Sequence, residues 1–197
     1  MGKAIAIVGM ACRFAGAASL QDYWRMCLEG RNAFGPIPAD RWDAEFFLSD
    51  NKRDADRSYA PAGAFIDDIR SFPAVALQIP PRRVEVMDPQ QRLAIEVGLD
   101  AIQDAGRTPE QMPDRTAVFM GVTAMEYRTI LNARVIAMMA ASGQLGSVSD
   151  PEALLASVEN VLPARPFTPP GVLASMVACA VAQELGLQGA AYSVDAA

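Results

Sequence analysis

Three short apolar runs along the chain predict buried strands. They cover residues 4–10, 116–122 and 190–195, and the first two are almost unbroken and contain or adjoin a glycine near their ends. An apolar run of this length is typical of a strand that is covered on both faces, as in a parallel sheet flanked by helices. We therefore expect these three segments to belong to one sheet.

The first helix is predicted to begin at Ser19. Asp22 follows three residues later, which is a capping-box arrangement with Asp in place of Glu, and Gly30 is placed to end the helix. The apolar positions between them recur at intervals of three and four residues, as expected for one helical face. They are Leu20, Tyr23, Trp24, Cys27 and Leu28.

A second helix is predicted from Asp88 to Gly106. Asp88 is a good N-cap, and Pro89 suits the first helical position because its missing N–H needs no partner there. Apolar residues cover most of the circumference and leave only a narrow polar strip, which predicts a mostly buried helix. That strip consists of Glu96, Asp100 and Gln103.

The remaining segments alternate between helical and irregular patterns. Residues 124–140, the segment that starts at Asp150-Pro151, and residues 171–184 are predicted helices. Residues 31–82 are irregular, and the four prolines of residues 163–170 are incompatible with a regular helix or a central strand. The order of elements predicts an α/β fold with a mostly parallel sheet and flanking helices.

Composition excludes several classes of function. The chain has 197 residues and a formal net charge of −6, which argues against nucleic-acid binding. Half of the residues are hydrophobic (51%), so intrinsic disorder is not expected, and no stretch is long and apolar enough to span a membrane. The apolar N-terminus is short and is followed by Arg13, which favours a strand over a signal peptide.

The absence of histidine is the most informative count. It removes every mechanism in which a histidine of this chain acts as the base, and it removes most zinc sites. Cys12, Cys27 and Cys179 are too far apart for a CxxC pair, and we interpret them as buried reduced thiols of a cytosolic protein.

Other candidate sites fail on spacing. The glycine-rich turn of residues 9–16 lacks the dinucleotide-binding pattern and a Walker lysine. Residues 50–56 lack the glycine and the closing glutamate of a calcium loop, and Asp67-Asp68 is interpreted as part of a solvated loop. The predicted elements alone do not assign a function.

Several segments, in this order, resemble the ketosynthase (β-ketoacyl synthase) domain of polyketide synthases. The most specific is Met87-Asp88-Pro89-Gln90-Gln91-Arg92-Leu93, and Glu96 with Asp104-Ala105-Gly106 extends it. The others are residues 5–14, 38–43, 63–68, 185–189 and 193–197. The resemblance implies that residues 1–197 form the N-terminal part of a ketosynthase domain, hence the N-terminal half of a thiolase-like fold.

The resemblance also implies a reaction, the decarboxylative Claisen condensation of an acyl thioester with a malonyl unit on an acyl carrier protein. In the family the motif resembling residues 193–197 continues with the nucleophilic cysteine, and two catalytic histidines follow much later. The resemblance therefore assigns no catalytic, cofactor-binding or metal-binding residue to this chain. We expect the chain to be inactive alone.

The resemblance further implies partners. In the family the strand resembling Tyr192, Ser193, Val194 and Asp195 pairs with its twin across a dimer axis. The expected partners are an acyl carrier protein, whose phosphopantetheine arm carries the substrate, and a homodimer mate or a complementary ketosynthase half. No other cofactor, nucleic acid or membrane is expected, and the expected location is the cytoplasm.

The chain departs from the family pattern at two places. Ala180 and Gln183 stand where arginine and tyrosine are common, and residues 61–63 replace the usual glycine pair. Open sheet edges and uncovered apolar faces predict association or poor solubility of the chain alone. A non-catalytic assembly or carrier-protein-binding subunit that completes a partner's fold is the alternative function. A stand-alone small-molecule binder is a weaker third one.

Overall fold

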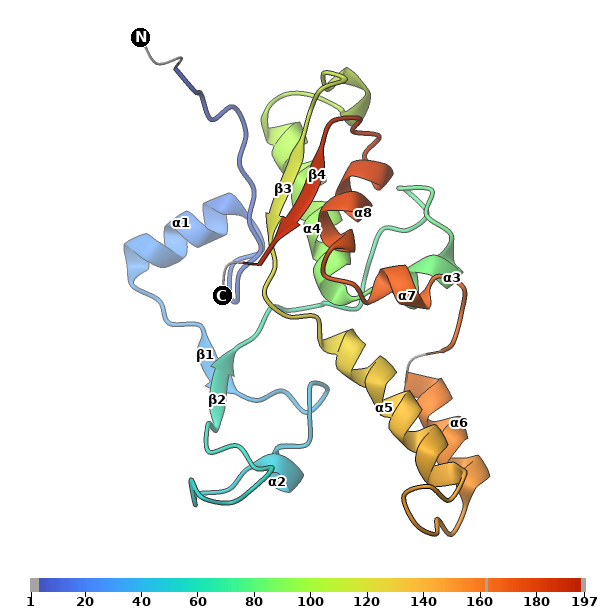
Figure 1. Cartoon of the computed structure of the whole chain (residues 1–197). Coiled ribbons are helices and arrows are strands. Elements are labelled where there is room, and N and C mark those ends of the chain that lie inside the picture. Colours follow the sequence, from blue (N-terminus) through green and yellow to red (C-terminus); the bar gives the residue numbers. More distant parts are fainter. Residues whose placement is uncertain (1–3, 162, 196–197) are drawn as a thin grey trace. The chain divides into compact units, whose positions relative to one another are not determined.

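The structure is a computed structural model that describes residues 4–161 and 163–195. The chain folds into two compact units, which are described separately. One unit comprises residues 10–69. The other combines residues 4–9 with residues 70–195 and contains both parallel strands (Figure 1).

The unit of residues 10–69 contains α1 (Leu20–Glu29), β1 (Phe34–Pro36), α2 (Ala44–Phe47) and β2 (Ala62–Ala64). The predicted ends of α1 are confirmed. The Ser19 hydroxyl accepts a hydrogen bond from the backbone N–H of Asp22, and Gly30 ends the helix with a left-handed backbone at φ 61°. Strands β1 and β2 pair antiparallel. Elements of only three or four residues follow α1, as the irregular pattern predicted.

The larger unit contains α3 (Pro81–Val84), α4 (Pro89–Asp104), the short 3-10 helix η1 (Pro109–Gln111) and β3 (Val118–Gly121). These are followed by α5 (Glu126–Ala141), α6 (Pro151–Val161), α7 (Thr168–Gly171), α8 (Met176–Glu184) and β4 (Ala191–Val194). Strands β3 and β4 pair in parallel, with Val118 opposite Ala191 and Gly121 opposite Val194. The predicted α/β fold class is confirmed by this arrangement.

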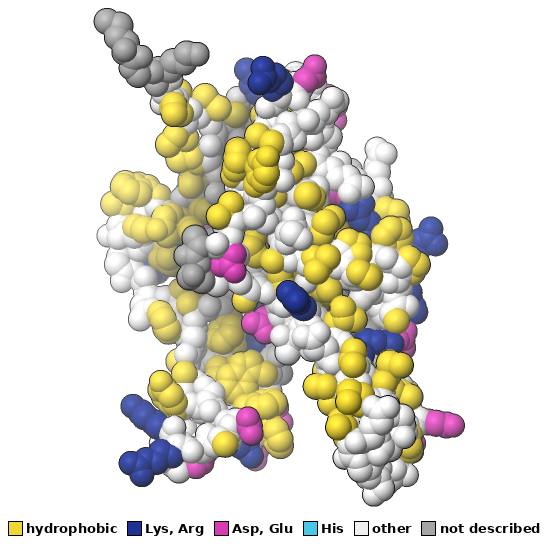
Figure 2. All heavy atoms as spheres, viewed as in Figure 1, with side chains coloured by type: hydrophobic (Ala, Val, Ile, Leu, Met, Phe, Trp, Pro, Cys, Tyr) yellow, Lys and Arg dark blue, Asp and Glu magenta, His cyan; other side chains and the backbone are white. Residues whose placement is uncertain are grey.

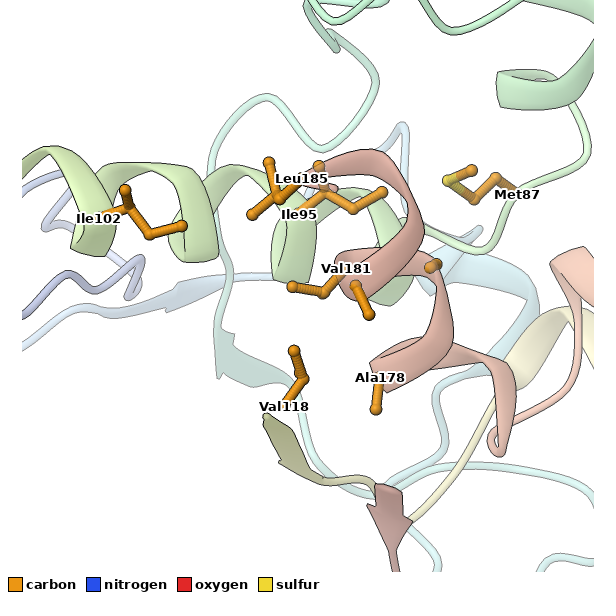
Figure 3. Close-up of a cluster of buried hydrophobic side chains, with 9 residues drawn as sticks. Met87, Ile95, Ile102, Val118, Ala178, Val181 and Leu185 are labelled. Carbon is orange, nitrogen blue, oxygen red and sulfur yellow. The ribbon is translucent and has the colours of Figure 1, made fainter. Parts of the chain in front are cut away.

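The main core lies between α4, α8 and β3 (Figure 3). Ile95 and Ile102 of α4 meet Val181 and Leu185 of α8, and Val118 of β3 closes the cluster. A Cβ added at Gly98 would lie 3.2 Å from Val181 Cγ1 and 3.3 Å from Leu185 Cδ1. The absence of a side chain at this position therefore lets α4 and α8 approach closely.

The predicted strand at residues 4–10 is wrong. The chain is irregular there, and Ile5, Ile7 and Val8 are 96%, 81% and 74% exposed. A strand exists only when its backbone groups pair with a neighbour, and β3 and β4 pair only with each other among the described residues. The apolar run is compatible with a strand but finds no partner strand here.

Two helix boundaries also differ from the prediction. The proline-rich segment is not wholly irregular, because α7 begins at Thr168. Pro169 and Pro170 lie in its first turn, where helical N–H groups have no intrahelical partner. The helix predicted to start at residue 171 begins at Met176, after a turn in which Val172 is buried.

The three cysteines are free thiols in the structure, and the prediction that they are buried is wrong. Cys27 is exposed, and Cys12 and Cys179 are half-buried. Burial raises the pKa of the Cys12 thiol above its ordinary value. Among the described residues no group of three or more His, Cys, Asp or Glu side chains is placed to hold a metal ion.

Candidate functional site

The candidate site is built on the two parallel strands. Side chains alternate between the faces of the β3–β4 pair, as the pleat requires. Met120 and Ala191 pack against the α4–α8 core. On the other face Phe119 and Tyr192 stack with ring centroids 5.6 Å apart and are 67% and 57% exposed. This pair of strands therefore has one face in the core and one exposed aromatic face.

Ser193 fixes β4 to α8. Its hydroxyl accepts a hydrogen bond from the backbone N–H of Ala178 at 3.1 Å and donates one to the backbone oxygen of Ser175 at 3.3 Å. One side chain thus satisfies two backbone groups in the first turn of α8, where no intrahelical partner is available to the N–H. Ser193 positions the carboxyl end of β4 relative to this helix.

Ser193→Ala is expected to lower the free energy of unfolding by about 1–2 kcal/mol, because two backbone groups lose their partner. Ser193→Thr keeps the hydroxyl and should recover most of the loss. Urea unfolding of the three proteins measures the effect. Equal midpoints for the alanine variant and the wild type would show that the hydroxyl does not stabilise β4.

The outer edge of β4 is unpaired within the described part of the chain, since β4 has only β3 as a neighbour. Of the four predicted interface residues, Tyr192, Val194 and Asp195 are exposed, and Ser193 faces α8. The end of the predicted motif, residues 196–197, lies outside the described residues. The edge and the exposed face are thus available to a further strand.

The segment Met87–Leu93 has a structural role that the sequence shows only in part. Asp88 is 2% exposed, and it caps α4 as predicted, with Oδ1 accepting from the N–H of Gln90 at 2.8 Å. Its Oδ2 also accepts from the N–H of Tyr127 at 3.4 Å, in the first turn of α5. A single carboxylate therefore serves the N-termini of two helices.

Asp88 and Gln91 also hold the turn before α8. The backbone N–H of Asp88 donates to the Gly171 oxygen at 2.9 Å, and Gln91 Nε2 donates to the Pro170 oxygen at 2.9 Å. Burial raises the pKa of Asp88 above its ordinary value, although the N–H groups of Gln90 and Tyr127 oppose the shift. The segment organises the scaffold beneath the strands and contributes no group to the exposed face.

Ala180 and Gln183, the two residues of the first departure from the family pattern, occupy different environments. Ala180 is 3% exposed and lies in the core, whereas Gln183 is exposed and its Oε1 accepts from Arg83 at 3.3 Å. Arg83 also pairs with Glu184 at 2.6 Å and so ties α3 to the end of α8. Sequence reasoning missed this ion pair, because the partners are about a hundred residues apart and no motif connects them.

Comparison with known proteins assigns the fold and the motifs to one family. The family of the β-ketoacyl synthase N-terminal domain matches residues 2–197. The chain belongs to the β-ketoacyl synthase family. The resemblance recognised from the motifs is confirmed, and it covers nearly the whole chain.

The ketosynthase relatives are polyketide synthases. A phenolphthiocerol/phthiocerol polyketide synthase protein of Mycobacterium tuberculosis is 39% identical over 135 residues, which are 68% of this chain and 9% of that protein. The spectinabilin polyketide synthase system protein NorC of Streptomyces orinoci is 34% identical over 200 residues, covering 100% of this chain and 8% of that protein. The chain thus spans less than a tenth of these relatives' length.

Solved ketosynthase structures share the thiolase-like fold of this chain. The ketosynthase from module 6 of the bacillaene synthase of Bacillus subtilis superposes with a TM-score of 0.67 and 25% identity, over 96% of this chain and 26% of that chain. An oxazolomycin ketosynthase domain of Streptomyces albus gives a TM-score of 0.73 at 24% identity, over 96% of this chain and 28% of that chain.

None of the described helices of this ketosynthase segment is long and apolar enough to cross a membrane.

Proposed function

We propose that this chain is the N-terminal part of a ketosynthase that extends a polyketide by decarboxylative Claisen condensation. The observation that carries the proposal is the family match over residues 2–197, which includes both parallel strands and the helices packed beneath them. The related proteins are polyketide synthases, which supports a polyketide product over a fatty acid. The acyl substrate arrives as a thioester on the phosphopantetheine arm of a carrier protein.

The condensation needs groups that this chain does not contain. A thiolate must first accept the acyl group as a thioester, and histidines must then assist the loss of CO2 from the malonyl unit. The chain has no histidine, and Cys179, the fourth residue of α8, lies between the buried Ala178 and Ala180. In this proposal the residues of this chain build the scaffold that holds β4 in place.

The chain alone is therefore expected to be inactive. Incubation with an acyl thioester and a malonyl carrier protein should give no acyl adduct and no CO2 above background. Addition of a polypeptide carrying the cysteine turn and both histidines of a ketosynthase should restore both signals. Intact-protein mass spectrometry detects the adduct, and labelled malonyl groups report CO2. Stoichiometric acylation of Cys12, Cys27 or Cys179, followed by condensation, would overturn this proposal.

The unpaired edge of β4 supports a partner strand in this proposal. That strand comes from a homodimer mate or from a complementary ketosynthase half, and it extends the sheet beside Tyr192 and Val194. The exposed Phe119–Tyr192 stack provides the apolar surface that such a partner covers. We place this assembly in the cytoplasm, where carrier proteins supply the substrates.

A second candidate function is a non-catalytic subunit that completes a partner's fold or binds a carrier protein. The alanine at position 180, where arginine is common in the family, favours this candidate. Pull-down with a carrier protein, without any complementary ketosynthase half, separates the two. Retention of the carrier protein together with inactivity of the reconstituted pair supports the non-catalytic role.

A further inference from the structure

Two of the three cysteines lie in the unit of residues 10–69, at and before its first helix. Cys12 precedes the tight turn that leads to α1, and Cys27 lies in the last turn of α1. Cys179, the third cysteine, belongs to α8 in the other unit. The proposed condensation gives no role to Cys12 or Cys27, so the function of these two thiols is a separate question.

The turn before α1 packs along that helix. Two backbone hydrogen bonds, of 2.9 and 3.0 Å, close the turn at residues 14–17. The Phe14 ring contacts the Tyr23 ring, with centroids 4.8 Å apart. A Cβ added at Gly16 would lie 3.7 Å from Met26 Sδ, so the turn also reaches the second half of the helix. The segment that carries the first thiol is therefore held against α1.

Tyr23 lies close to both thiols. Its hydroxyl hydrogen-bonds to Cys27, one helical turn further along α1, and this bond raises the pKa of Tyr23 above its ordinary value. Cys12 makes a smaller electrostatic contribution in the same direction, which requires it to lie near the same phenol. Phe14, two residues after Cys12, contacts the Tyr23 ring and gives the same placement. Both thiols are therefore near one side chain.

The two thiols differ in accessibility. Cys27 is exposed on α1, and Figure 2 shows hydrophobic side chains, a class that includes Cys and Tyr, gathered over this helix. Cys12 is half-buried, and burial raises the pKa of its thiol. An exposed thiol beside a less accessible one is typical of redox-sensing cysteines, in which the first thiol reacts with the oxidant and the second resolves the product.

We propose that Cys12 and Cys27 are a redox-active pair, which a low-molecular-weight disulfide such as oxidised glutathione converts into an intramolecular disulfide. The Cys27 thiolate attacks one sulfur of oxidised glutathione, which releases one glutathione thiolate and leaves a mixed disulfide. The Cys12 thiolate then attacks the Cys27 sulfur and releases the second glutathione. The two protein thiols are oxidised, the oxidant's disulfide is reduced, and both protons end on the two released glutathiones.

The bond joins α1 to the turn that precedes it and closes the loop of residues 12–27. The thiols are free in this structure, as a reducing compartment keeps them, and a rise in oxidised glutathione closes the bond. The proposal goes beyond the proposed condensation and does not depend on it, because neither thiol takes part in that reaction.

Oxidation of the folded 197-residue chain with oxidised glutathione, followed by maleimide labelling and intact-protein mass spectrometry, tests the pair. The product should have lost two hydrogen atoms, and Cys179 should be its only labelled thiol. Cys12→Ser should stop at a stable glutathione adduct on Cys27. Cys27→Ser should form an adduct about tenfold or more slowly, because the remaining thiol is less accessible. Cys179→Ser is the matched control and should form the disulfide at the wild-type rate.

Oxidation in urea shows whether the folded structure brings the two thiols together. Closure of the mixed disulfide onto Cys12 should be about tenfold or more slower in urea, because the ends of the unfolded loop must then meet by diffusion. A peptide map of the oxidised chain identifies the bonded pair. Equal closure rates in urea and in buffer overturn the proposal, as does a folded chain that keeps its glutathione adduct without closing. A disulfide to Cys179, or between two chains, in place of the expected pair overturns it as well.

Discussion

Asp88→Ala is expected to lower the free energy of unfolding by about 2–4 kcal/mol. The carboxylate accepts from Gln90 in α4 and from Tyr127 in α5, so its loss leaves two helix N-termini without an acceptor. Because Asp88 is 2% exposed, water cannot replace the lost oxygens without entering the core. A single helix cap contributes about 1 kcal/mol, so a dual cap in a buried setting should exceed it.

Asp43→Ala is the matched control for this prediction. Asp43 is also an N-cap, and its Oδ1 accepts from the N–H of Phe46 at 3.1 Å, but this contact is exposed and serves only α2. Its loss should cost about 1 kcal/mol or less. Urea unfolding followed by circular dichroism compares the two variants with the wild type. A similar loss in both would contradict a dual, buried cap at position 88.

Because the pKa of Asp88 is raised, we expect the free energy of unfolding to depend on pH in a defined direction. The folded chain holds this proton more tightly than the unfolded chain, so the contribution of the group to stability is greatest below its ordinary pKa of 3.8. It is lost as the pH rises through the folded pKa. Asparagine does not titrate in this pH range. The free energy of unfolding of the wild type, relative to that of Asp88→Asn, should therefore fall as the pH rises through the folded pKa of Asp88. A difference that is constant with pH would contradict the shift.

The sequence correctly predicted the helices whose ends are marked by nearby capping residues. Ser19 and Gly30 bound α1, and Asp88 with Pro89 begins α4, because capping depends on residues a few positions apart. The segment at residues 4–10 shows the limit of such signals. Its apolar pattern favours a strand, yet strand formation depends on a neighbour that the local sequence does not specify.

The candidate site was predictable as a position but not as a set of contacts. Motif resemblance placed Tyr192–Asp195 on a strand, and the structure confirms a strand that ends at Val194. The anchor of Ser193 on Ser175 and the second cap by Asp88 on Tyr127 join residues 18 and 39 positions apart. Only the packing of α8 and α5 brings these groups together, so no sequence spacing could have revealed them.

Gly189→Ala is expected to lower the free energy of unfolding by about 3 kcal/mol. A Cβ at Gly189 would lie 2.3 Å from the Thr116 oxygen and 2.5 Å from its carbonyl carbon, so the clash is with backbone. The N–H of Gly189 also donates to that same oxygen at 3.0 Å. The chain enters β4 just after this contact, and any shift that relieves the clash also moves β4 relative to β3.

Gly121→Ala is the matched control, because it makes the same substitution in the strand that pairs with β4. No atom lies within 4 Å of a Cβ added at Gly121, and its backbone is open to any L-residue. Alanine there should change stability little, or raise it by about 0.5 kcal/mol through a less flexible unfolded chain. Urea midpoints of the two variants provide the comparison. Equal effects would show that β3 and β4 do not depend on the close approach at Gly189.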